Sequence, residues 1–383
     1  MTSTSILFQP FEIKSLKLKN RITMAPTFLG YAGADGMVGD LVLDHYREMA
    51  ASGAAMIVVE NASVDPIGSG SPFTIRADDD RFVEGLGRLA RVIKDQGAVA
   101  VQQLNHAGRF GFSKERLAPS AGADGGPPGE MTPADIDRAV EAFASAAARV
   151  EAAGFDGVEI HGGTGYLIDQ FLSPLINRRR DGYGGSLENR LRFPLRVFEA
   201  VKAAVSPGFP VGHRLLADEA LPGGLGPAET RLWAAELEKR GVAYLSVMFG
   251  TYDSFFLPEY VARERTEGYM APYAGEIKKA ARGTPIITAG RIQSPPTAEA
   301  ILEAGTADLI GLARVLVADP LWPKKAAGEI AEPITRCEPT CMLCMKRVMA
   351  GKPAFCSQWS KDRREAFLRR VGEKPEEVQQ TAG

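Results

Sequence analysis

Short apolar runs alternate along the whole chain with segments whose apolar positions recur every three or four residues. The runs lack the polar alternation of a half-exposed strand, so each indicates a strand that is buried on both faces. The segments between them have the spacing of amphipathic helices. The pattern predicts eight strands, at residues 21–26, 54–60, 98–104, 157–160, 209–216, 242–248, 284–290 and 307–314.

The helix that precedes the fourth strand has the clearest start. Thr132 is a candidate N-cap, Pro133 fits the first helical position, and Asp135 favours the positive end of the helix. We predict that this helix continues to Gly154. Further helices are predicted at residues 41–52, 79–96, 187–205, 227–240, 271–282, 296–304 and 319–329.

Eight strand–helix pairs over about 330 residues predict an α/β chain folded as a (β/α)8 TIM barrel. The active-site groups would then lie on the loops that follow the strands. A doubly wound parallel sheet is the alternative. We predict a barrel over residues 1–330, a cysteine-rich, cluster-binding extension over 331–360, and a charged tail over 361–383 that forms a solvated helix with a frayed end.

Composition narrows the class of function. The chain has 383 residues and a formal net charge of -2, which gives no electrostatic case for binding nucleic acid or an anionic membrane. No apolar run approaches the roughly 20 residues that span a bilayer. The N-terminus lacks the regions of a secretory signal. We therefore expect a cytoplasmic enzyme with a small-molecule substrate.

All four cysteines fall within one short segment, as Cys337, Cys341, Cys344 and Cys356. A disulfide framework would spread its cysteines through the fold, and cytosolic thiols stay reduced, so the clustering favours a metal centre. The spacing C-x3-C-x2-C-x11-C suits either a 4Fe-4S cluster or a structural zinc ion.

The residues after the fourth strand carry candidate chemistry. His161, Thr164 and Tyr166 lie on a glycine-rich turn directly after the apolar run 157–160. Enzymes of the α/β class place their reacting groups at such C-terminal strand ends. We therefore predict that this strand carries the active site.

The seventh and eighth strands end in ITAGRIQSPP and IGLARVLVADP. In barrels, the loops at these two positions commonly bind phosphate through backbone N–H groups and a nearby helix start. Gly290 permits a close approach of the backbone, and Arg291 and Arg314 can each offer a charged fork. The pair predicts a cofactor that carries a phosphate group.

Other strand ends suit a flat heteroaromatic ring. Gln103 can both donate and accept hydrogen bonds, and Arg214 can stabilise negative charge on a ring. Thr27, which follows Pro26, can bond a ring carbonyl. Each of these residues taken alone is more often structural. Together with the phosphate site they describe flavin mononucleotide, FMN, lying across the barrel mouth.

The sequences RITMAP, QQLNHAGR, AGFDGVEIH, TAGRI and GLAR resemble those of the Old Yellow Enzyme family of FMN barrels, over about residues 6 to 325. Within the family, the cysteine segment resembles that of the 2,4-dienoyl-CoA reductase and trimethylamine dehydrogenase branch, in which a 4Fe-4S cluster follows the barrel. The resemblance therefore favours iron–sulfur over zinc. That branch typically runs C-x2-C-x3-C, so the position of Cys341 differs.

The resemblance implies a hydride transfer from reduced FMN to an activated C=C bond, with Tyr166 as the proton donor. His161 would hydrogen-bond the carbonyl group of the substrate. Its usual partner, His or Asn, is Thr164 here, whose hydroxyl can donate one bond but carries no charge. FMN would contact Ala25, Pro26, Thr27, Asn61, Gln103, Arg214, Gly290, Arg291, Ala313 and Arg314. The family often has Gly at position 61, and Asn tolerates a positive φ better than most residues.

The resemblance also implies that the cluster relays electrons to or from FMN. No dinucleotide-binding motif follows the cysteines up to Gly383. We therefore expect a separate NAD(P)H-dependent reductase or electron carrier as a partner. The alternative is a nicotinamide that docks directly over FMN, and the chain can also form a homo-oligomer.

The main alternative is an amine dehydrogenase or demethylase that oxidises a C–N bond through FMN and the cluster. Trimethylamine-type members have an aromatic residue shortly after the third cysteine, where this chain has MKRV. Phe28, Phe249 and Tyr252 can supply rings for a cation elsewhere. A non-catalytic electron-transfer subunit is disfavoured because Tyr166 and His161 are both present.

Overall fold

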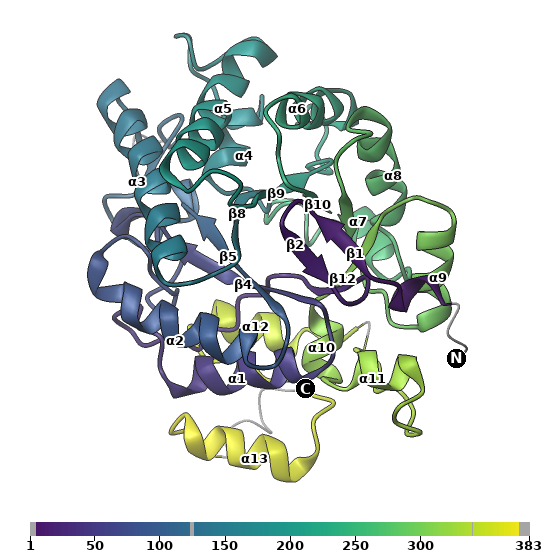
Figure 1. Ribbon diagram of the computed structural model, residues 1–383. Helices are drawn as coiled ribbons and strands as arrows, with labels where there is room; N and C mark the ends of the chain where they lie inside the picture. The colour runs from purple at the N-terminus through teal and green to yellow at the C-terminus, as the bar shows by residue number, and fades with distance from the viewer. Residues whose placement is uncertain (1–4, 123–125, 339, 375–383) are drawn as a thin grey trace.

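Eight parallel strands close into a barrel, and helices surround it (Figure 1). The computed structural model describes residues 5–122, 126–338 and 340–374. The barrel strands are β3 (Ile22–Met24), β4 (Met56–Ser63), β5 (Val99–Asn105), β8 (Gly157–Gly162), β9 (Val211–Leu216), β10 (Leu245–Met248), β11 (Ile286–Thr288) and β12 (Leu309–Leu312). Pairing of β12 with β3 closes the ring. The predicted (β/α)8 TIM barrel is therefore confirmed, and the doubly wound sheet is excluded.

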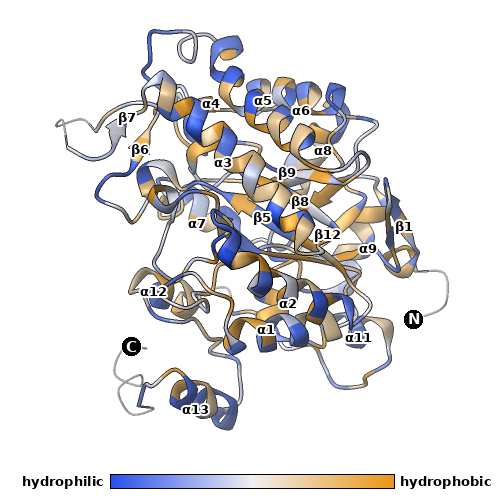
Figure 2. Ribbon diagram, turned by 60° about the vertical axis from the view of Figure 1, so that its left-hand side comes forward, coloured by the Kyte–Doolittle hydropathy of each residue, from blue (hydrophilic) through white to orange (hydrophobic). Residues whose placement is uncertain are grey.

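The helices bury their apolar faces against the barrel. Figure 2 shows hydrophilic residues on the outer faces of α3 and α5, while side chains such as Phe143, Val197 and Trp233 are almost completely buried. The helices around the barrel are α1 (Asp40–Ala51), α2 (Val83–Lys94), α3 (Pro133–Ala152), α4 (Leu167–Leu172), α5 (Leu187–Ala204), α6 (Pro227–Lys239), α7 (Pro258–Glu264), α8 (Ala271–Ala280), α9 (Pro295–Glu303), α10 (Arg314–Ala318) and α11 (Trp322–Ala327).

An N-terminal hairpin that the pattern did not predict closes the end of the barrel at which the strands begin. Its strands, β1 (Phe11–Ile13) and β2 (Leu16–Leu18), pair antiparallel. Ile13 and Leu18 are buried in one cluster with Met56 and Leu309, which lie at the starts of their strands. Three-residue strands are too short to show a period, so the hydrophobic pattern carries no signal for them. The hairpin leaves the C-terminal strand ends as the accessible mouth.

The predicted helix start at Thr132 is confirmed. The Thr132 hydroxyl accepts a hydrogen bond from the Asp135 backbone N–H at 3.2 Å, and the Asp135 carboxylate accepts one from the Thr132 N–H at 2.9 Å. The two residues form a reciprocal capping box, with Pro133 in the first turn. The helix α3 therefore begins where its side chains satisfy the otherwise unpaired N–H groups.

The cysteine segment and the tail pack on the barrel. They contain α12 (Leu343–Met349) and α13 (Lys361–Arg370). The predicted tail helix is present and largely solvated, but one side of it packs on the protein. Leu368 is buried, and the Phe367 ring lies 5.7 Å from the Tyr31 ring of the barrel. Arg363 also pairs with Glu48 on α1, beside which α13 lies in Figure 1. The expected frayed end, 375–383, falls outside the described residues.

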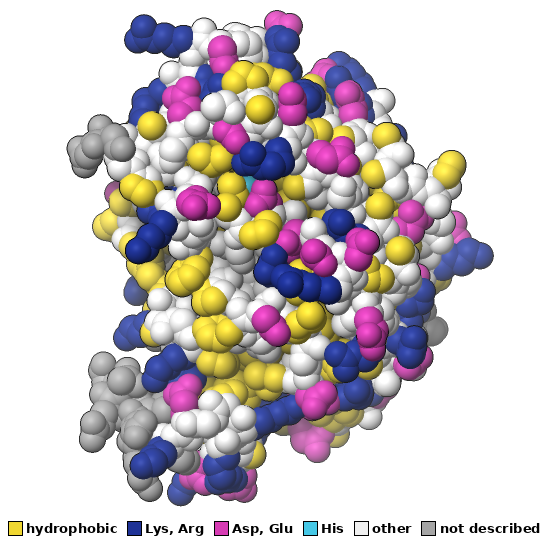
Figure 3. All heavy atoms as spheres, turned by 90° about the vertical axis from the view of Figure 1, so that its left-hand side faces the viewer, with side chains coloured by type: hydrophobic (Ala, Val, Ile, Leu, Met, Phe, Trp, Pro, Cys, Tyr) yellow, Lys and Arg dark blue, Asp and Glu magenta, His cyan; other side chains and the backbone are white. Residues whose placement is uncertain are grey.

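The surface carries charges of both signs. On the face in Figure 3, Lys and Arg side chains are interspersed with Asp and Glu, with hydrophobic side chains between them. Within the described ranges, no helix has the length and apolarity that crossing a bilayer requires.

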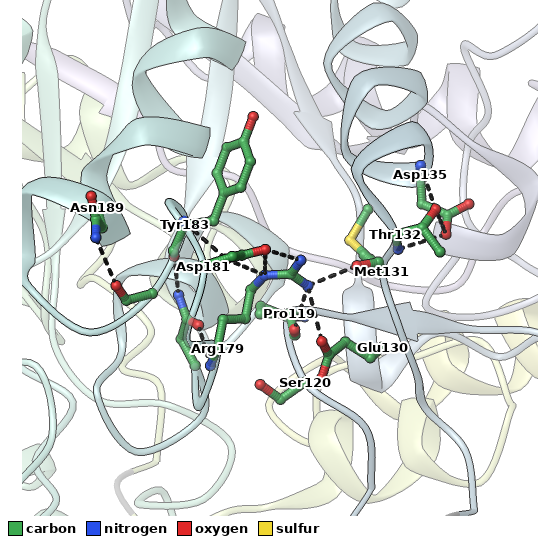
Figure 4. A network of polar contacts seen from close by, with 12 residues as sticks. Pro119, Ser120, Glu130, Met131, Thr132, Asp135, Arg179, Asp181, Tyr183 and Asn189 are labelled. Atoms are coloured by element: carbon green, nitrogen blue, oxygen red, sulfur yellow. Dashed lines mark hydrogen bonds and ion pairs between the residues drawn. The ribbon is translucent and has the colours of Figure 1, made fainter.

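The basic loop after α4 is held by one arginine (Figure 4). The Arg179 guanidinium donates to the backbone carbonyls of Pro119 at 2.9 Å and Met131 at 2.7 Å, and it pairs with Asp181 at 2.6 Å. Only 4% of its side chain is exposed. Arg179 therefore ties this loop to the segment that leads into α3, including the short strands β6 (Leu117–Ala118) and β7 (Gly129–Glu130).

Replacing Arg179 tests this interpretation. Arg179→Met leaves two carbonyls without their donor, and each unpaired buried group costs about 1–3 kcal/mol. We expect the free energy of unfolding to fall by about 2–4 kcal/mol in urea titrations. The neighbouring side chain of Arg180 is exposed, so Arg180→Met is the matched control and should change stability by less than about 0.5 kcal/mol. Equal losses in the two variants would contradict a structural role for Arg179.

Candidate active site

One cavity of about 320 Å³ opens at the C-terminal ends of the barrel strands and reaches the cysteine segment. It is lined by Pro26, Thr27, Asn61, Gln103, His161, Thr164, Tyr166, Arg214, Gly290, Arg291, Ala313, Arg314, Cys337, Cys341, Cys344 and Cys356. The structure thus brings together every predicted site residue except Ala25. Ala25 is buried below the cavity, and its N–H donates to the Leu312 carbonyl at 2.8 Å.

Strand register aligns the polar groups of the barrel mouth. Gln103 on β5 lies beside Glu159 on β8, and its amide donates to the carboxylate at 2.7 Å. His161 on β8 lies beside Arg214 on β9. Arg214 lies beside Ser246 on β10, and donates to its hydroxyl at 3.0 Å. Glu159 is a member of this network that our residue assignments missed, although a Glu inside a buried apolar run was a signal for it.

Burial and charge determine the protonation of these groups. Burial raises the pKa of Glu159, and the positive charge of Arg214 opposes that rise. Burial, with Arg214 and His213 nearby, lowers the pKa of His161 well below its ordinary value. His161 is therefore neutral at pH 7 and has one N–H to donate. Its Nδ1 atom has no hydrogen-bond partner among the described residues.

Tyr166 is paired with a second tyrosine. The hydroxyl groups of Tyr166 and Tyr252 lie 2.8 Å apart. Burial first, and then the neighbouring Tyr252, raise the pKa of Tyr166 well above its ordinary value, so its phenol stays protonated at neutral pH. Tyr252 comes from the loop after β10. The sequence suggested it only as an aromatic ring, because nothing local indicates a contact across 86 positions.

Thr164 supports this pair through its backbone. It has a φ of 62°, which is rare for a β-branched residue, and its carbonyl accepts from the Tyr252 N–H at 3.3 Å. Its hydroxyl lies 3.5 Å from the Met248 sulfur, the partner that the structure gives it. Thr164 lines the cavity, but its clearest contribution is to place Tyr252.

The two predicted phosphate arginines share one carboxylate. The Glu264 Oε1 atom at the end of α7 lies 3.1 Å from Arg291 Nη2 and also pairs with Arg314 Nη2. The Arg291 Nε–H donates to the Glu264 backbone carbonyl at 2.8 Å. The pair therefore binds an anion, as a phosphate site must. Glu264 was not predicted, because α7 lies in a connection whose sequence carries no recognisable motif.

The residues at the barrel mouth fit FMN. Three guanidinium groups line the cavity, that of Arg214 on β9 and those of Arg291 and Arg314 after β11 and β12. Gly290 has a φ of 101°, and a Cβ atom there would lie 2.9 Å from the Met270 backbone nitrogen. A side chain at this position would therefore collide with the neighbouring backbone. One detail is corrected: Asn61 lies inside β4 and is not among the described residues with a positive φ. Thr27 Oγ1 donates to the Ala25 carbonyl at 3.3 Å.

The four cysteines line the same cavity as the strand-end residues. Cys341 Sγ lies 3.1 Å from the Ser357 hydroxyl, and the Gln358 N–H donates to Cys356 Sγ at 3.4 Å. Burial raises the pKa of Cys337 and Cys344, an effect that Arg314 opposes. In the described part of the chain, no three His, Cys, Asp or Glu side chains gather closely enough to hold one metal ion. A 4Fe-4S cluster presents four separate irons, so its ligands need not meet at one point.

The other three histidines are packed. The His213 ring meets Trp233 edge-on at 5.4 Å, and the His45 ring contacts the rings of Tyr31 and Tyr46. His106 does not line the cavity, and its Nδ1 accepts from the Gly108 N–H at 3.1 Å.

Glu60 on β4 supports the loop that joins the barrel to the cysteine segment. Its buried carboxyl accepts from the Leu29 N–H at 2.9 Å, in the loop after β3. In the same loop, the Leu29 carbonyl accepts from the Ala354 N–H at 2.9 Å, and the Tyr31 hydroxyl donates to the Ala354 carbonyl at 2.6 Å. Burial raises the pKa of Glu60 to about 8.

The model for the NADH:flavin oxidoreductase / NADH oxidase family matches residues 6–332. The chain belongs to this family. The family confirms the resemblance drawn from the sequence and makes the chain an oxidoreductase of an FMN-dependent type. Membership of the family does not by itself assign the site residues or the substrate, because one fold of this kind serves many reactions.

Individual proteins are also similar to this chain. A metal reductase of Desulforamulus reducens is 41% identical over 371 residues, which is 95% of this chain and 55% of that protein. A solved 2-naphthoyl-CoA reductase complex has a TM-score of 0.88 at 28% identity, covering 92% of this chain and 57% of that chain. Histamine dehydrogenase from Rhizobium sp. 4-9 has a TM-score of 0.80 at 28% identity, covering 92% and 52%. The chain spans about half the length of these proteins.

The pKa of Glu60 predicts a pH-dependent stability. It is 4.5 as a free group and about 8 in the fold, so the native state keeps a proton that the unfolded chain releases. The stability contributed by the protonated carboxyl is fully present below about pH 4.5 and is lost as pH rises towards 8. At about 1.4 kcal/mol per unit, the oxidoreductase should lose about 3–5 kcal/mol between pH 5 and pH 8.5 relative to Glu60→Gln, which accepts the same bond without titrating. Parallel urea-unfolding profiles for the two proteins would contradict this.

Proposed function

We propose that this family member is an ene-reductase that reduces an activated C=C bond of enoyl, dienoyl or enone type. The observation that carries the proposal is the protonated Tyr166 hydroxyl on the cavity wall, paired with Tyr252. An amine oxidation has no use for such a proton donor, whereas reduction of a double bond needs one. The structural likeness to a 2-naphthoyl-CoA reductase solved with 2-naphthoyl-CoA supports the same class.

The chain's own residues provide the proton and the activation. When bound, FMN supplies the hydride. Tyr166 holds the proton for the alkene carbon next to the one that receives the hydride. The side chain of Tyr252 reaches solvent and can return a proton to Tyr166 after turnover. A phenol is a weak acid, so the substrate must be activated. The neutral His161 can donate its N–H to the carbonyl or thioester oxygen, which spreads the negative charge that develops there.

The same residues would hold FMN. Gln103 and Arg214 would meet the polar edge of the ring, with Pro26, Thr27 and Asn61 around it. Gly290, Arg291, Ala313 and Arg314 would bind the phosphate. The support is the fit already described: three arginines that line one cavity, and a glycine at a position where a side chain would collide with Met270.

We further propose that Cys337, Cys341, Cys344 and Cys356 bind a 4Fe-4S cluster, with zinc as the alternative. Their place on the wall of the flavin cavity supports a cluster, because electrons pass efficiently between neighbouring redox groups while a structural zinc gains nothing from that position. The electrons would come from a separate NAD(P)H-dependent reductase or electron carrier, or from another part of a longer chain.

One observation favours a second function, amine dehydrogenation. Phe249, Tyr252, Phe255, Tyr260 and Tyr269 line one side of the cavity. The faces of such rings can attract a cationic substrate. Histamine dehydrogenase, a structural neighbour, is named for such a reaction.

An anaerobic experiment separates the two functions. The purified protein is reduced with dithionite and mixed separately with an enone and a dienoyl thioester, and the oxidised protein is mixed with a methylated amine and with histamine. The ene-reductase proposal requires that an alkene reoxidises the flavin. Bleaching of the oxidised flavin by an amine, with no response to either alkene, would establish the second function instead.

Tyr166→Phe tests the proton donor. We expect alkene reduction to slow by about 10²–10⁴-fold, the usual contribution of a positioned general acid, while reduction of the flavin by dithionite is unchanged. The control is Tyr273→Phe, because Tyr273 packs against Phe249 outside the hydroxyl pair. An unchanged rate of alkene reduction in Tyr166→Phe would remove Tyr166 from the mechanism.

Cys344→Ala tests the metal centre. If the four cysteines bind a 4Fe-4S cluster, the wild type should contain about four irons and four sulfides per chain, and the variant should lose them together with its broad visible absorbance. Ser357→Ala serves as the control, because Ser357 contacts Cys341 without being a proposed ligand. Zinc in place of iron in the wild type would identify the alternative.

A further inference from the structure

A carboxylate occupies the arginine pair to which we assign the cofactor phosphate. Glu264 Oε1 contacts the Nη2 atoms of both Arg291 and Arg314. The Glu264 side chain is 17% exposed and that of Arg291 only 3%, so water screens this contact poorly. The contact with Arg291 is therefore screened less than an ion pair on an open surface, while the Arg314 side chain is 28% exposed.

The segment that carries Glu264 is docked at several points on the loop after β11. The Gly268 N–H donates to the Gly290 carbonyl at 2.8 Å. The Glu267 carboxylate accepts from the N–H groups of Gln293 and Ser294, at the start of α9. Two acidic side chains of one segment thus engage arginine forks and helix-start N–H groups, the donors that usually bind phosphate.

A phosphate and this carboxylate require the same donors. A phosphate monoester carries between one and two negative charges near pH 7, with a second pKa of about 6. Each arginine has a fixed set of N–H groups, and the two Nη2 groups are already directed at Glu264 Oε1. Placing a phosphate beside the carboxylate would also bring like charges together in a sheltered site. Occupancy by one therefore opposes occupancy by the other.

We propose that Glu264 is an internal competitor of the flavin phosphate, which must release Arg291 and Arg314 before the phosphate binds. Glu264 thereby lowers the affinity for FMN and reduces the advantage of FMN over riboflavin, which lacks the phosphate. This inference rests on the proposed flavin site. In the cofactor-free protein the same carboxylate stabilises the fold, because it compensates the buried charge of Arg291.

Removing the charge of Glu264 should therefore raise the affinity for FMN and lower the stability of the cofactor-free protein. In Glu264→Gln the phosphate meets no competing charge, and we expect FMN to bind about tenfold more tightly or better, where tenfold corresponds to about 1.4 kcal/mol. Riboflavin affinity should be unchanged. The melting temperature of the cofactor-free variant should fall, because Arg291 loses its counter-anion.

Flavin fluorescence titrations of the deflavinated full chain measure these affinities. The matched control is Glu259→Gln, which removes the same charge from an exposed position of α7 and should bind both flavins as the wild type does. Glu264→Asp is a second variant that keeps the charge but is too short to reach both arginines. It should bind FMN more tightly than the wild type and less tightly than Glu264→Gln. Circular dichroism verifies that each variant is folded.

Arg314→Met separates this inference from the flavin site on which it rests. If Arg314→Met binds FMN as tightly as the wild type, the proposed phosphate site itself is wrong. If Arg314→Met weakens FMN binding while Glu264→Gln and Glu264→Asp leave it unchanged or weaken it, the flavin site stands and the competition is refuted. Tighter FMN binding in both Glu264 variants, without a change for riboflavin, supports the competition.

Discussion

Guanidinium charge sheltered at the barrel mouth is the constraint on which the site depends. Arg214, Arg291 and Arg314 project where the strands end, and each needs an anion or a dipole because isolated charge is costly away from water. Glu159 and Glu264 provide the negative charge. Burial, and then the positive charge of Arg214, lowers the pKa of His161 and so keeps it neutral. The arrangement that solves this electrostatic problem is also one suited to an anionic ring and a phosphate.

The cysteine segment is joined to the barrel through buried polar bonds and aromatic packing. The loop after β3 contributes Thr27 to the cavity and, a few residues later, bonds the segment through Leu29 and Tyr31. The Tyr31 ring also packs against Phe367 of α13. The cysteine segment and the barrel mouth therefore share one stretch of chain. This shared loop explains why the two predicted parts line one cavity.

Much of the candidate site was predictable because a closed parallel barrel gathers all strand ends at one rim. Predicting that Gln103, Arg214 and Arg291 end strands was sufficient to place them together, whatever the detailed packing. Tyr252 and Glu264 were not predictable in their roles, because they come from the connection between β10 and α8, where no period or motif records which strand end the chain approaches. For Asn61 the sequence-based expectation was wrong. Asn tolerates a positive φ, but this residue lies within the extended strand β4 and does not need one.

The sequence by itself determined the barrel, its helix starts and the position of the candidate chemistry at strand ends, since hydrophobic period and capping residues act locally. It also determined membership of the flavin family through its motifs. Tertiary structure alone decided the partners: Tyr252 for Tyr166, Glu264 for the two arginines, and α1 for the tail helix. The physical reason is that these contacts join residues far apart in the chain. Their energies depend on burial and on distances that exist only once the barrel has closed.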